Sequence, residues 1–379
     1  MRVTCHWIDA SFTMQKRLIA FRVFDDQNTA HNIYRMMKVI FDEYGLGEKI
    51  LTIGFDNASA NTASINDLKS ICQPNLGGRF FHIRCTCHVL NLCVHDGLKL
   101  LSPFIDPIKK ALNYIWSYSQ VRREWTKFCK INGIKPIKFS RDVPTHWNST
   151  YFLLCQAFQY KDALCSFFSQ HVQNITLYPS QWDICEKILD ILRVFNDATL
   201  VFSGVYYPTA HLFLLESLNI VGTLDEHADN DDPNDIVLLE AITVMKVKWL
   251  NYFREIPLLY LIAVVFDPRF KFKGLNGGLQ AYYGYLGILD EIDITSIMTK
   301  LRSDLIILFN DYIVRYNLGT LGQSSSSEPV IQTRLSAGDR WLLQRNKKTR
   351  DTTTNNTELD NYLSTNFKFP TENLVSKKI

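Results

Sequence analysis

The sequence predicts an α/β fold in which a small mixed sheet precedes a long and almost entirely helical stretch. Over roughly the first hundred residues, short apolar runs of strand length alternate with segments of helical periodicity. From His88 to about Leu215, apolar residues recur almost throughout at helical spacing. Because 46% of the 379 residues are hydrophobic, the protein can bury a large core, which argues against wholesale disorder.

The N-terminal segment supplies the strands of the expected sheet. Runs rich in Val, Ile, Phe and Trp predict neighbouring strands at residues 2–8 and 17–24. Apolar residues at helical spacing then predict a helix over residues 29–44. Residues 50–55 form a continuous apolar run, typical of a strand buried on both faces, and a second helix and a strand at residues 80–84 follow it. This order indicates a mixed sheet with helices packed on its faces.

The middle of the chain is expected to be helical. One apolar stripe predicts a single helix over residues 108–130, and its members are Ile108, Ala111, Ile115, Tyr118, Val121, Trp125 and Phe128. The same periodicity predicts helices within residues 151–169, 184–202 and 292–316.

A short apolar stretch returns after the helical region. Residues 258–266 follow Pro257 and run into Asp267 and Pro268, and a strand-like composition continues to Lys273. We expect a buried strand here. This longest apolar stretch is far shorter than the ~20 residues that a membrane-spanning helix needs. The N-terminus has no basic segment followed by an apolar one, so neither a signal peptide nor a membrane partner is expected.

Charge is distributed unevenly along the chain. The net charge is only +3 and the isoelectric point is near 8.3, so no overall basic field indicates nucleic-acid binding. No Lys or Arg occurs between Arg193 and Lys246, where we expect an acidic, solvated loop that contains Asp225, Glu226, Asp229, Asp231, Asp232 and Asp235. Residues 319–357 turn polar, then basic, then rich in Thr and Asn, which predicts a flexible linker. The nine cysteines, an odd number, indicate reduced thiols in the cytosol or nucleus.

Asp56 is the residue most suggestive of chemistry. It follows the strand expected at residues 50–55, so it projects from the carboxyl edge of the sheet, where α/β folds usually bind ligands. Divalent cations such as Mg²⁺ prefer carboxylate oxygens of this kind. An Asp before Asn-Ala-Ser suits a helix N-cap equally well. The local pattern alone favours the cap and leaves a metal ligand as the alternative.

Five short segments follow one another in a characteristic order. They are Thr52-Ile-Gly-Phe-Asp-Asn-Ala-Ser-Ala-Asn61, Arg84-Cys-Thr-Cys-His-Val-Leu-Asn-Leu92, Pro144-Thr-His-Trp-Asn-Ser-Thr-Tyr151, Val264-Val-Phe-Asp-Pro-Arg-Phe-Lys271 and Glu358-Leu-Asp-Asn-Tyr-Leu363. Together they resemble the hAT transposase family, especially its plant ricesleeper- and daysleeper-like members. Each segment alone is a weak signal, but five in this order cover nearly the whole chain.

The resemblance implies an RNase H-like mixed sheet that is interrupted by a large all-helical insertion domain. It also implies the domain organisation. We expect the N-terminal part of the core at residues 1–87, the insertion at 88–257, the return to the core at 258–318, the linker at 319–357 and the start of a C-terminal dimerisation region at 358–379.

The resemblance further implies a catalytic chemistry. In the family, two Asp and one Glu hold two divalent metals that cleave and transfer DNA strands. Asp56 matches the second Asp and is therefore the expected metal ligand. Cys85 and His88 match a Cys-x-x-His motif, so His88 is expected near the active site, where it would contact a phosphate or assist proton transfer.

The chain departs from the family pattern at both ends. The family's first Asp lies on a strand before the one at residues 2–9, and its Glu lies in a helix beyond Ile379. With Asp56 as the one remaining acid, we expect a catalytically inactive protein that requires no cofactor, with Mg²⁺ serving any residual activity. We also expect no N-terminal zinc finger, a weakened homodimer, and an exposed edge strand at residues 2–9.

Basic side chains decorate the polar side of the helix expected at residues 108–130. They are Lys109, Lys110, Arg122, Arg123, Lys127 and Lys130. These residues are candidates for DNA binding through phosphate neutralisation, and an ordinary solvated helix face is the alternative. A second basic cluster is a candidate for phosphate contact, an unstructured tail or a localisation signal, and consists of Arg345, Lys347, Lys348 and Arg350.

The leading hypothesis is a transposase-derived, catalytically inactive nuclear protein that binds DNA and has no small-molecule substrate. The alternatives are a residual nuclease that uses Asp56 with neighbours such as Asp9, and a protein-interaction scaffold. Zinc binding is disfavoured because Cys85, Cys87, His88, Cys93 and His95 lack the usual ligand spacing of a structural site. We interpret Trp147 as a core residue.

Overall fold

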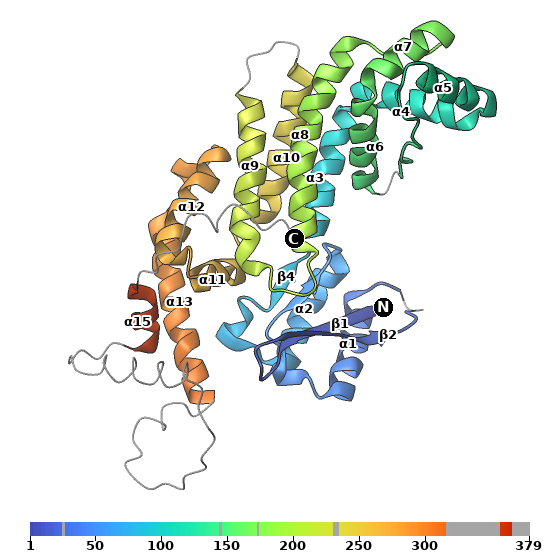
Figure 1. Ribbon diagram of the computed structural model, residues 1–379. Helices are drawn as coiled ribbons and strands as arrows, with labels where there is room; N and C mark the ends of the chain where they lie inside the picture. The colour runs from blue at the N-terminus through green and yellow to red at the C-terminus, as the bar shows by residue number, and fades with distance from the viewer. Residues whose placement is uncertain (25–26, 144–145, 173, 230–234, 316–356, 366–379) are drawn as a thin grey trace, which may run out of the picture.

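The computed structural model describes residues 1–24, 27–143, 146–172, 174–229, 235–315 and 357–365 (Figure 1). An N-terminal α/β unit lies at one end of a long helical arm. A second group of helices from the C-terminal part of the chain packs beside the base of the arm.

The N-terminal unit contains two small sheets in place of the single mixed sheet that the sequence predicts. Strand β1 (Arg2–Ile8) pairs antiparallel with β2 (Met14–Phe21), and β3 (Ile53–Phe55) pairs parallel with β4 (His82–Arg84). Among the described residues the two pairs are not joined by hydrogen bonds, so the expectation of one sheet is wrong. The second edge of β1 is unpaired there, as expected from the sequence.

Asp9 closes the turn between β1 and β2. Its Oδ1 accepts hydrogen bonds from the backbone N–H groups of Ser11 and Thr13, each at 3.0 Å, and its Oδ2 accepts one from Gln15 at 2.8 Å. The Ser11 hydroxyl, which donates to Oδ1 at 2.6 Å, contributes most to lowering the pKa of Asp9 to about 2, and the bonds from Thr13, Gln15 and the Ser11 N–H add to it. Asp9 therefore stabilises the hairpin.

Two helices cover the N-terminal sheets. Helix α1 (Ala30–Tyr44) begins at Thr29, whose side chain accepts a hydrogen bond from the N–H of Asn32, and it ends at Gly45 with a positive φ of 56°. Helix α2 (Ser59–Cys72) packs against α1. Together they enclose one apolar cluster with the sheets, formed by Ile33, Met37, Phe41, Ile53, Ile65, Leu68, Cys72 and Phe81.

The arm is helical, as the periodicity of residues 88–215 predicts, and eight α-helices form it in the described part of the chain. They are α3 (Thr86–Leu100), α4 (Ser102–Ser117), α5 (Ser119–Ile131), α6 (Trp147–Gln159), α7 (Lys161–His171), α8 (Pro179–Phe202), α9 (Phe213–Ala228) and α10 (Ile236–Phe253). The helices α4, α5 and α7 lie at the end of the arm that is distant from the N-terminal unit (Figure 1).

The single helix expected at residues 108–130 is divided into α4 and α5. The break lies at Tyr118, which has extended dihedral angles (φ −112°, ψ 115°) between Ser117 and Ser119. Tyr118 is 56% exposed, although its position in the apolar stripe predicts burial. Burial therefore provides no reason for a continuous helix here, and Ser favours helix ends over helix interiors.

The acidic segment is not the solvated loop that the sequence predicts. Asp225 and Glu226 belong to α9, and Asp235 is only 1% exposed and forms an ion pair with Lys187. Asp231 and Asp232 lie outside the described residues. The composition alone did not reveal that a cation of α8 neutralises Asp235.

The apolar stretch after the arm is helical, so the strand expected there is wrong. Helix α11 (Leu258–Phe266) is followed by α12 (Lys271–Tyr285) and α13 (Ile294–Arg315), the last of which was expected. A short apolar run buried on several sides shows no periodicity that distinguishes a strand from a helix. The side chains of α11 join the same large apolar cluster as those of the arm.

The C-terminal helix α15 (Glu358–Ser364) packs against the corner between α11 and α12. The Tyr362 hydroxyl donates to the carbonyl of Phe266 at 3.0 Å, and the Lys271 ammonium donates to the carbonyls of Tyr362 and Thr365. Leu359 is buried beneath the helix. The linker expected at residues 319–357 lies outside the described residues except for Thr357.

None of the described helices is by itself long and apolar enough to span a membrane. Helices α10 and α11 pass this test only as a pair, and they meet at a bend of 88°.

Candidate functional site

The carboxyl ends of β3 and β4 bring two sequence-predicted segments together. In this parallel pair Phe55 lies opposite Arg84, so the residues that follow each strand leave the same edge. The backbone N–H of Cys85 donates to the carbonyl of Phe55 at 2.7 Å and extends the pairing by one step. Asp56 and the Cys85–His88 segment therefore start side by side.

Asp56 takes part in organising the start of α2. It is exposed, and its Oδ1 accepts hydrogen bonds from the N–H of Ala58 at 3.0 Å and from the side-chain amide of Asn61 at 2.6 Å. Ala58 is the N-cap residue, so Asp56 supports the helix start from two positions before it. Within the described ranges, no group of three or more His, Cys, Asp or Glu side chains is arranged to hold a metal.

The sequence interpretation missed two polar side chains of this region: Asn57 directly follows Asp56, and His82 begins β4 opposite Ile53. Both side-chain amide atoms of Asn57 and the Nε2 of His82 are buried and have no hydrogen-bond partner in the described part of the chain. The His82 ring lies 6.3 Å from the Phe55 ring, at the end of β3. Buried polar groups without a protein partner commonly bind water or a ligand. The signal available in the sequence was the Asn that directly follows Asp56.

His88 lies in the first turn of α3 and is half-buried. The turn is anchored by Thr86, whose hydroxyl lies 2.9 Å from the buried Tyr260 hydroxyl of α11. Cys85 is the N-cap residue of α3, and Cys87 approaches the carbonyl of Thr199 in α8 at 3.9 Å.

The thiol of Cys85 is in an unusual electrostatic environment. A hydrogen bond from the Cys87 thiol, together with the N–H of His88, lowers the pKa of Cys85 to about 6, although partial burial acts in the opposite direction. The same contact raises the pKa of Cys87, because a second thiolate beside the first is unfavourable.

The six predicted DNA-binding residues differ in their exposure and in the contacts that their side chains make with other residues. Lys109 forms an ion pair with Asp142 at 2.8 Å and is mostly buried. Arg122 donates to the carbonyl of Trp116 at 2.5 Å and its guanidinium lies 5.0 Å from the indole ring centre. The four exposed residues that form no ion pair among the described residues are Lys110, Arg123, Lys127 and Lys130.

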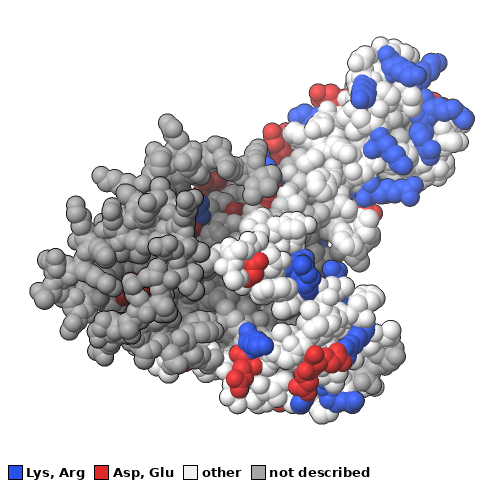
Figure 2. Space-filling model, turned by 60° about the horizontal axis from the view of Figure 1, so that its bottom comes forward, with Lys and Arg blue, Asp and Glu red and all other residues white. Residues whose placement is uncertain are grey.

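The loop after α5 extends this basic surface with residues that the sequence interpretation did not single out. Lys135, Lys138 and Arg141 are exposed there, and the Lys138 ammonium lies 5.3 Å from the centre of the Trp116 ring, which Arg122 also contacts. Residues 107–141 contain nine Lys and Arg residues and one acidic residue, Glu124, which gives a local net charge of +8 before the ion pair of Lys109 with Asp142, just outside this range, is counted. Figure 2 shows Lys and Arg side chains gathered over the end of the arm. We call this region of residues 107–141 the basic tip.

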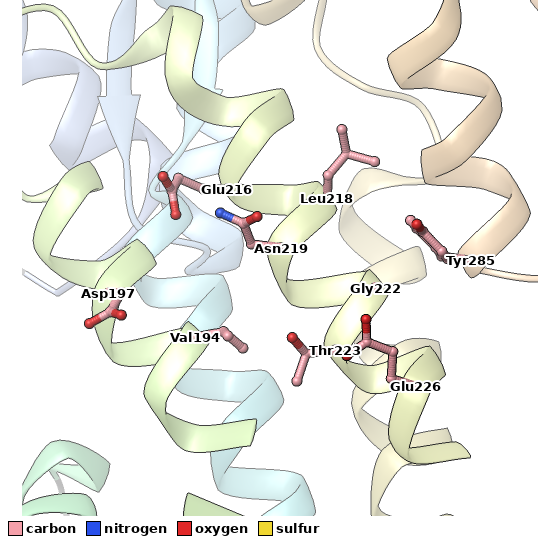
Figure 3. Close-up of a pocket in the computed structure, with 9 residues that line it drawn as sticks. All are labelled: Val194, Asp197, Glu216, Leu218, Asn219, Gly222, Thr223, Glu226 and Tyr285. Atoms are coloured by element: carbon pink, nitrogen blue, oxygen red, sulfur yellow. The ribbon is translucent and has the colours of Figure 1, made fainter. Parts of the chain in front are cut away.

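A cavity of about 380 Å³ between α8, α9 and the end of α12 has the opposite character (Figure 3). Its lining includes the carboxylates of Asp197, Glu216 and Glu226, with the ring of Tyr285 on the side of α12. Burial and the nearby Asp197 raise the pKa of Glu216. The cavity contains none of the catalytic or DNA-binding candidates.

Three family models match the chain in succession. Residues 1–77 match the ZBED1 RNase-like domain, residues 83–191 match the ZBED1 RNase-like helical domain, and residues 211–312 match the hAT-like transposase RNase-H fold. The chain belongs to the hAT transposase family. Within this hAT chain, Asp56 lies in the first matched region, and His88 and the basic tip lie in the second.

Several curated plant proteins are related to this hAT chain. A Zea mays protein named as an AC transposase is 30% identical over 295 residues, which cover 75% of this chain and 36% of that protein. The zinc finger BED domain-containing protein RICESLEEPER 1 of Oryza sativa subsp. japonica is 24% identical and is covered to 41%, with 75% of this chain aligned. The Arabidopsis thaliana protein DAYSLEEPER is 22% identical and is also covered to 41%, with 74% of this chain aligned. The hAT chain thus spans about two fifths of the length of these relatives.

Proposed function

We propose that this transposase-derived chain binds duplex DNA through its basic tip. The observation that carries the proposal is the local charge of +8 within residues 107–141, at the end of an arm that holds it away from the N-terminal unit. The relatives RICESLEEPER 1 and DAYSLEEPER are both named as zinc finger BED domain-containing proteins. This supports an association with DNA and therefore a nuclear location.

The geometry of α5 favours contact with a phosphate backbone. Arg123, Lys127 and Lys130 are spaced by four and three residues, so they project from one face of the helix. The opposite face is anchored in the core by Trp125 and Cys129. A rigid row of cations releases counterions when it meets DNA, and this release supplies affinity without reading sequence.

The helical arm is, in this proposal, an insertion into an RNase H-like core. The match to an RNase-like helical domain at residues 83–191 lies between matches to an RNase-like domain and an RNase-H fold. An insertion of this kind would carry the DNA-binding surface, while the edge with Asp56 and His88 belongs to the core. The weakened homodimer expected from the sequence remains a prediction.

We further propose that this chain by itself does not cleave DNA. One oxygen of Asp56 is occupied by Ala58 and Asn61, and Asp9 is fully engaged in its hairpin turn. The described residues offer no three-ligand group for a divalent metal, whereas two-metal strand transfer needs several converging carboxylates.

DNA binding is tested by a charge-matched pair of variants. The tip variant is Arg123→Gln/Lys127→Gln/Lys130→Gln. The control variant removes three exposed cations elsewhere and is Arg35→Gln/Lys49→Gln/Lys300→Gln. In fluorescence anisotropy with a labelled duplex at about 0.1 M salt, we expect the tip variant to bind at least about tenfold more weakly, and the control to change less than about threefold. Equal losses in both variants would show that only the overall charge matters and would refute the tip as the binding surface.

Catalysis is tested by plasmid nicking with Mg²⁺ or Mn²⁺. We expect no nicking by the wild-type chain above the background of the Asp56→Ala variant. Metal-dependent nicking that disappears in Asp56→Ala would overturn the proposal of inactivity and favour the nuclease alternative.

A protein-interaction scaffold is the second candidate, and the acidic cavity between α8 and α9 favours it. Carboxylates of Asp197, Glu216 and Glu226 around one cavity suit a basic side chain of a partner protein. Pull-down after nuclease treatment separates the two candidates. Partners bridged by DNA are lost on treatment, while a partner bound at the cavity is retained and is lost in Asp197→Asn/Glu226→Gln.

A further inference from the structure

Trp116, at the end of α4, is contacted by two cations of the basic tip. The Arg122 guanidinium lies 5.0 Å from the centre of the Trp116 ring, and the Lys138 ammonium lies 5.3 Å from it. Within the described residues, no other aromatic ring has two such cations over it. The electron-rich face of an indole attracts cations. Trp116 therefore holds together two side chains that come from α5 and from the loop after it.

Both cations are attached to backbone that is fixed in place. Arg122 lies in the first turn of α5 and also donates to the carbonyl of Trp116 at 2.5 Å. Lys138 directly precedes Phe139, which is 2% exposed and packs edge-on against Tyr160, with ring centres 5.6 Å apart. The loop is thus anchored in the core next to Lys138.

Neither cation is neutralised within the described part of the chain. Arg122 and Lys138 are both exposed and form no ion pair there. The one acidic residue of the basic tip, Glu124, accepts a hydrogen bond from Gln120 at 3.0 Å, and residues two apart on a helix, such as Arg122 and Glu124, do not face each other. Because both cations lie close to one ring centre, they are at most about 10 Å apart. One ligand with several negative charges can therefore contact both.

We propose that Trp116 is a positioning residue that holds Arg122 and Lys138 as a preformed clamp for adjacent phosphates of one DNA strand. This inference rests on the proposed binding of duplex DNA. A long exposed side chain normally loses conformational freedom when it meets a phosphate, and the ring reduces this cost by restricting both side chains in advance. A guanidinium offers paired donors and an ammonium a compact charge, and both suit phosphate oxygens.

The clamp is separate from the row formed by Arg123, Lys127 and Lys130 on α5. Arg122 and Arg123 are consecutive, so their directions from the helix axis differ by about 100°. The row and the clamp therefore contact DNA from two directions. Phosphate contacts from two directions fix the orientation of the tip on the duplex as well as supplying affinity.

The role of Trp116 is tested by a mutant cycle on the whole chain, with the anisotropy assay at about 0.1 M salt. We expect Trp116→Leu to bind the duplex about five- to tenfold more weakly, and Trp116→Phe, which keeps an aromatic face, to stay within about threefold of wild type. Arg122→Gln/Lys138→Gln should weaken binding at least as much and make the slope of log K against log salt about 1.8 shallower. In that background Trp116→Leu should have no further effect. An equal loss from Trp116→Leu with and without the two cations would refute the positioning role.

Phe128→Leu is the matched control for effects on packing. Phe128 is a half-buried aromatic residue of the same tip, and no Lys or Arg of the described residues lies over its ring. Its substitution should change the affinity less than about twofold, because no cation depends on it. If Phe128→Leu costs as much affinity as Trp116→Leu, the loss comes from packing and the clamp is refuted.

A probe without a duplex separates the clamp from DNA binding as a whole. Trp116 is one of seven tryptophans, so its indole N–H signal can be resolved by NMR after ¹⁵N labelling of Trp and assigned by its loss in Trp116→Phe. Inorganic pyrophosphate should shift this signal saturably in the wild type and not in Arg122→Gln/Lys138→Gln. No shift, together with salt-dependent duplex binding, would overturn the clamp and leave the proposed function intact. A shift without duplex binding would overturn the proposed function and DNA as the ligand of the clamp.

Discussion

Arg269 neutralises a carboxylate that is almost completely buried at the end of α11. Asp267 is 6% exposed and accepts hydrogen bonds from the Nε of Arg269 at 2.9 Å and from its Nη2 at 2.6 Å. Burial alone would raise the pKa of Asp267, but the bonds from Arg269 reverse this and lower it. The family motif at residues 264–271 thus contains a local ion pair rather than a candidate metal ligand.

Replacing Arg269 with Ala should destabilise the chain by about 2 kcal/mol at pH 7, because Asp267 loses its bidentate partner. A lowered folded-state pKa stabilises the fold above the unfolded value of about 3.9, and this contribution is lost as the pH falls through the folded value. The difference between wild type and Arg269→Ala in urea denaturation should therefore shrink below about pH 4.

Arg254→Ala is the control for this prediction, because its ion pair with Glu291 is half exposed on both sides. Its cost should stay below about 1 kcal/mol. If the two variants cost the same, or the difference between Arg269→Ala and wild type grows in acid, the buried pair does not stabilise the fold in this way.

The sequence located only those residues of the candidate site that directly follow a strand. Asp56 at the end of β3 and the Cys-x-x-His segment at the start of α3 were both located from local pattern and family resemblance. Asn57 and His82 were not, since their importance depends on burial without a partner. Lys109 looked like its neighbour Lys110, and only the fold shows that Asp142 neutralises it.

Helices α3 and α10 pack closely where Gly97 faces Met245. A Cβ at Gly97 would lie 1.9 Å from the Met245 Cε and 2.8 Å from its Cγ, and Met245 is buried. The absence of a side chain at Gly97 therefore sets the separation of the two helices.

Gly97→Ala should destabilise the chain by about 1 to 3 kcal/mol, because Met245 must leave its packed position. Gly277→Ala is a matched control in helix α12, where an added Cβ meets no atom within 4 Å. The control should be stabilising by about 0.5 to 1 kcal/mol, since Ala favours helix over Gly. Chemical denaturation of both variants checks this, and a stabilising Gly97→Ala would mean that Met245 moves at no cost.

The sequence predicted those helices that have one apolar face and recognisable capping residues. It did not predict elements whose conformation depends on the residues packed around them. Helix α1 has an apolar face, a Thr cap and a closing Gly, so its expected and observed limits agree within one residue. Helix α11 is enclosed by other helices, so its sequence is apolar throughout and was interpreted as a strand. The sequence also gives no strong indication that a helix ends at Tyr118, because no Gly or Pro lies next to it.

Charge is separated along the whole molecule. The basic tip carries +8 within a chain whose net charge is only +3, so the remainder is net acidic. The acidic cavity between α8 and α9 is one part of that remainder. A charge distribution of this kind orients the molecule so that the tip meets a polyanion first.

DNA affinity should depend steeply on salt despite the low net charge. With about four to six phosphate contacts at the tip, the slope of log K against log salt should be about −4 to −5, and the tip variant should be about 2.7 shallower. Anisotropy titrations between about 50 and 200 mM NaCl measure both slopes. A slope near zero for the wild type would exclude phosphate contact as the source of affinity.

Motifs and periodicity are properties of neighbouring residues, so the amino-acid sequence was enough to indicate the family, the helical character of the arm, the edge position of Asp56 and the basic residues of α5. The folded chain was needed to show that Leu258–Phe266 is a helix, that the described strands form two separate pairs, and that Asp142 neutralises Lys109. It also joined α5 and the following loop into one basic tip. These features depend on contacts between residues far apart in the chain, whose energies outweigh local preference.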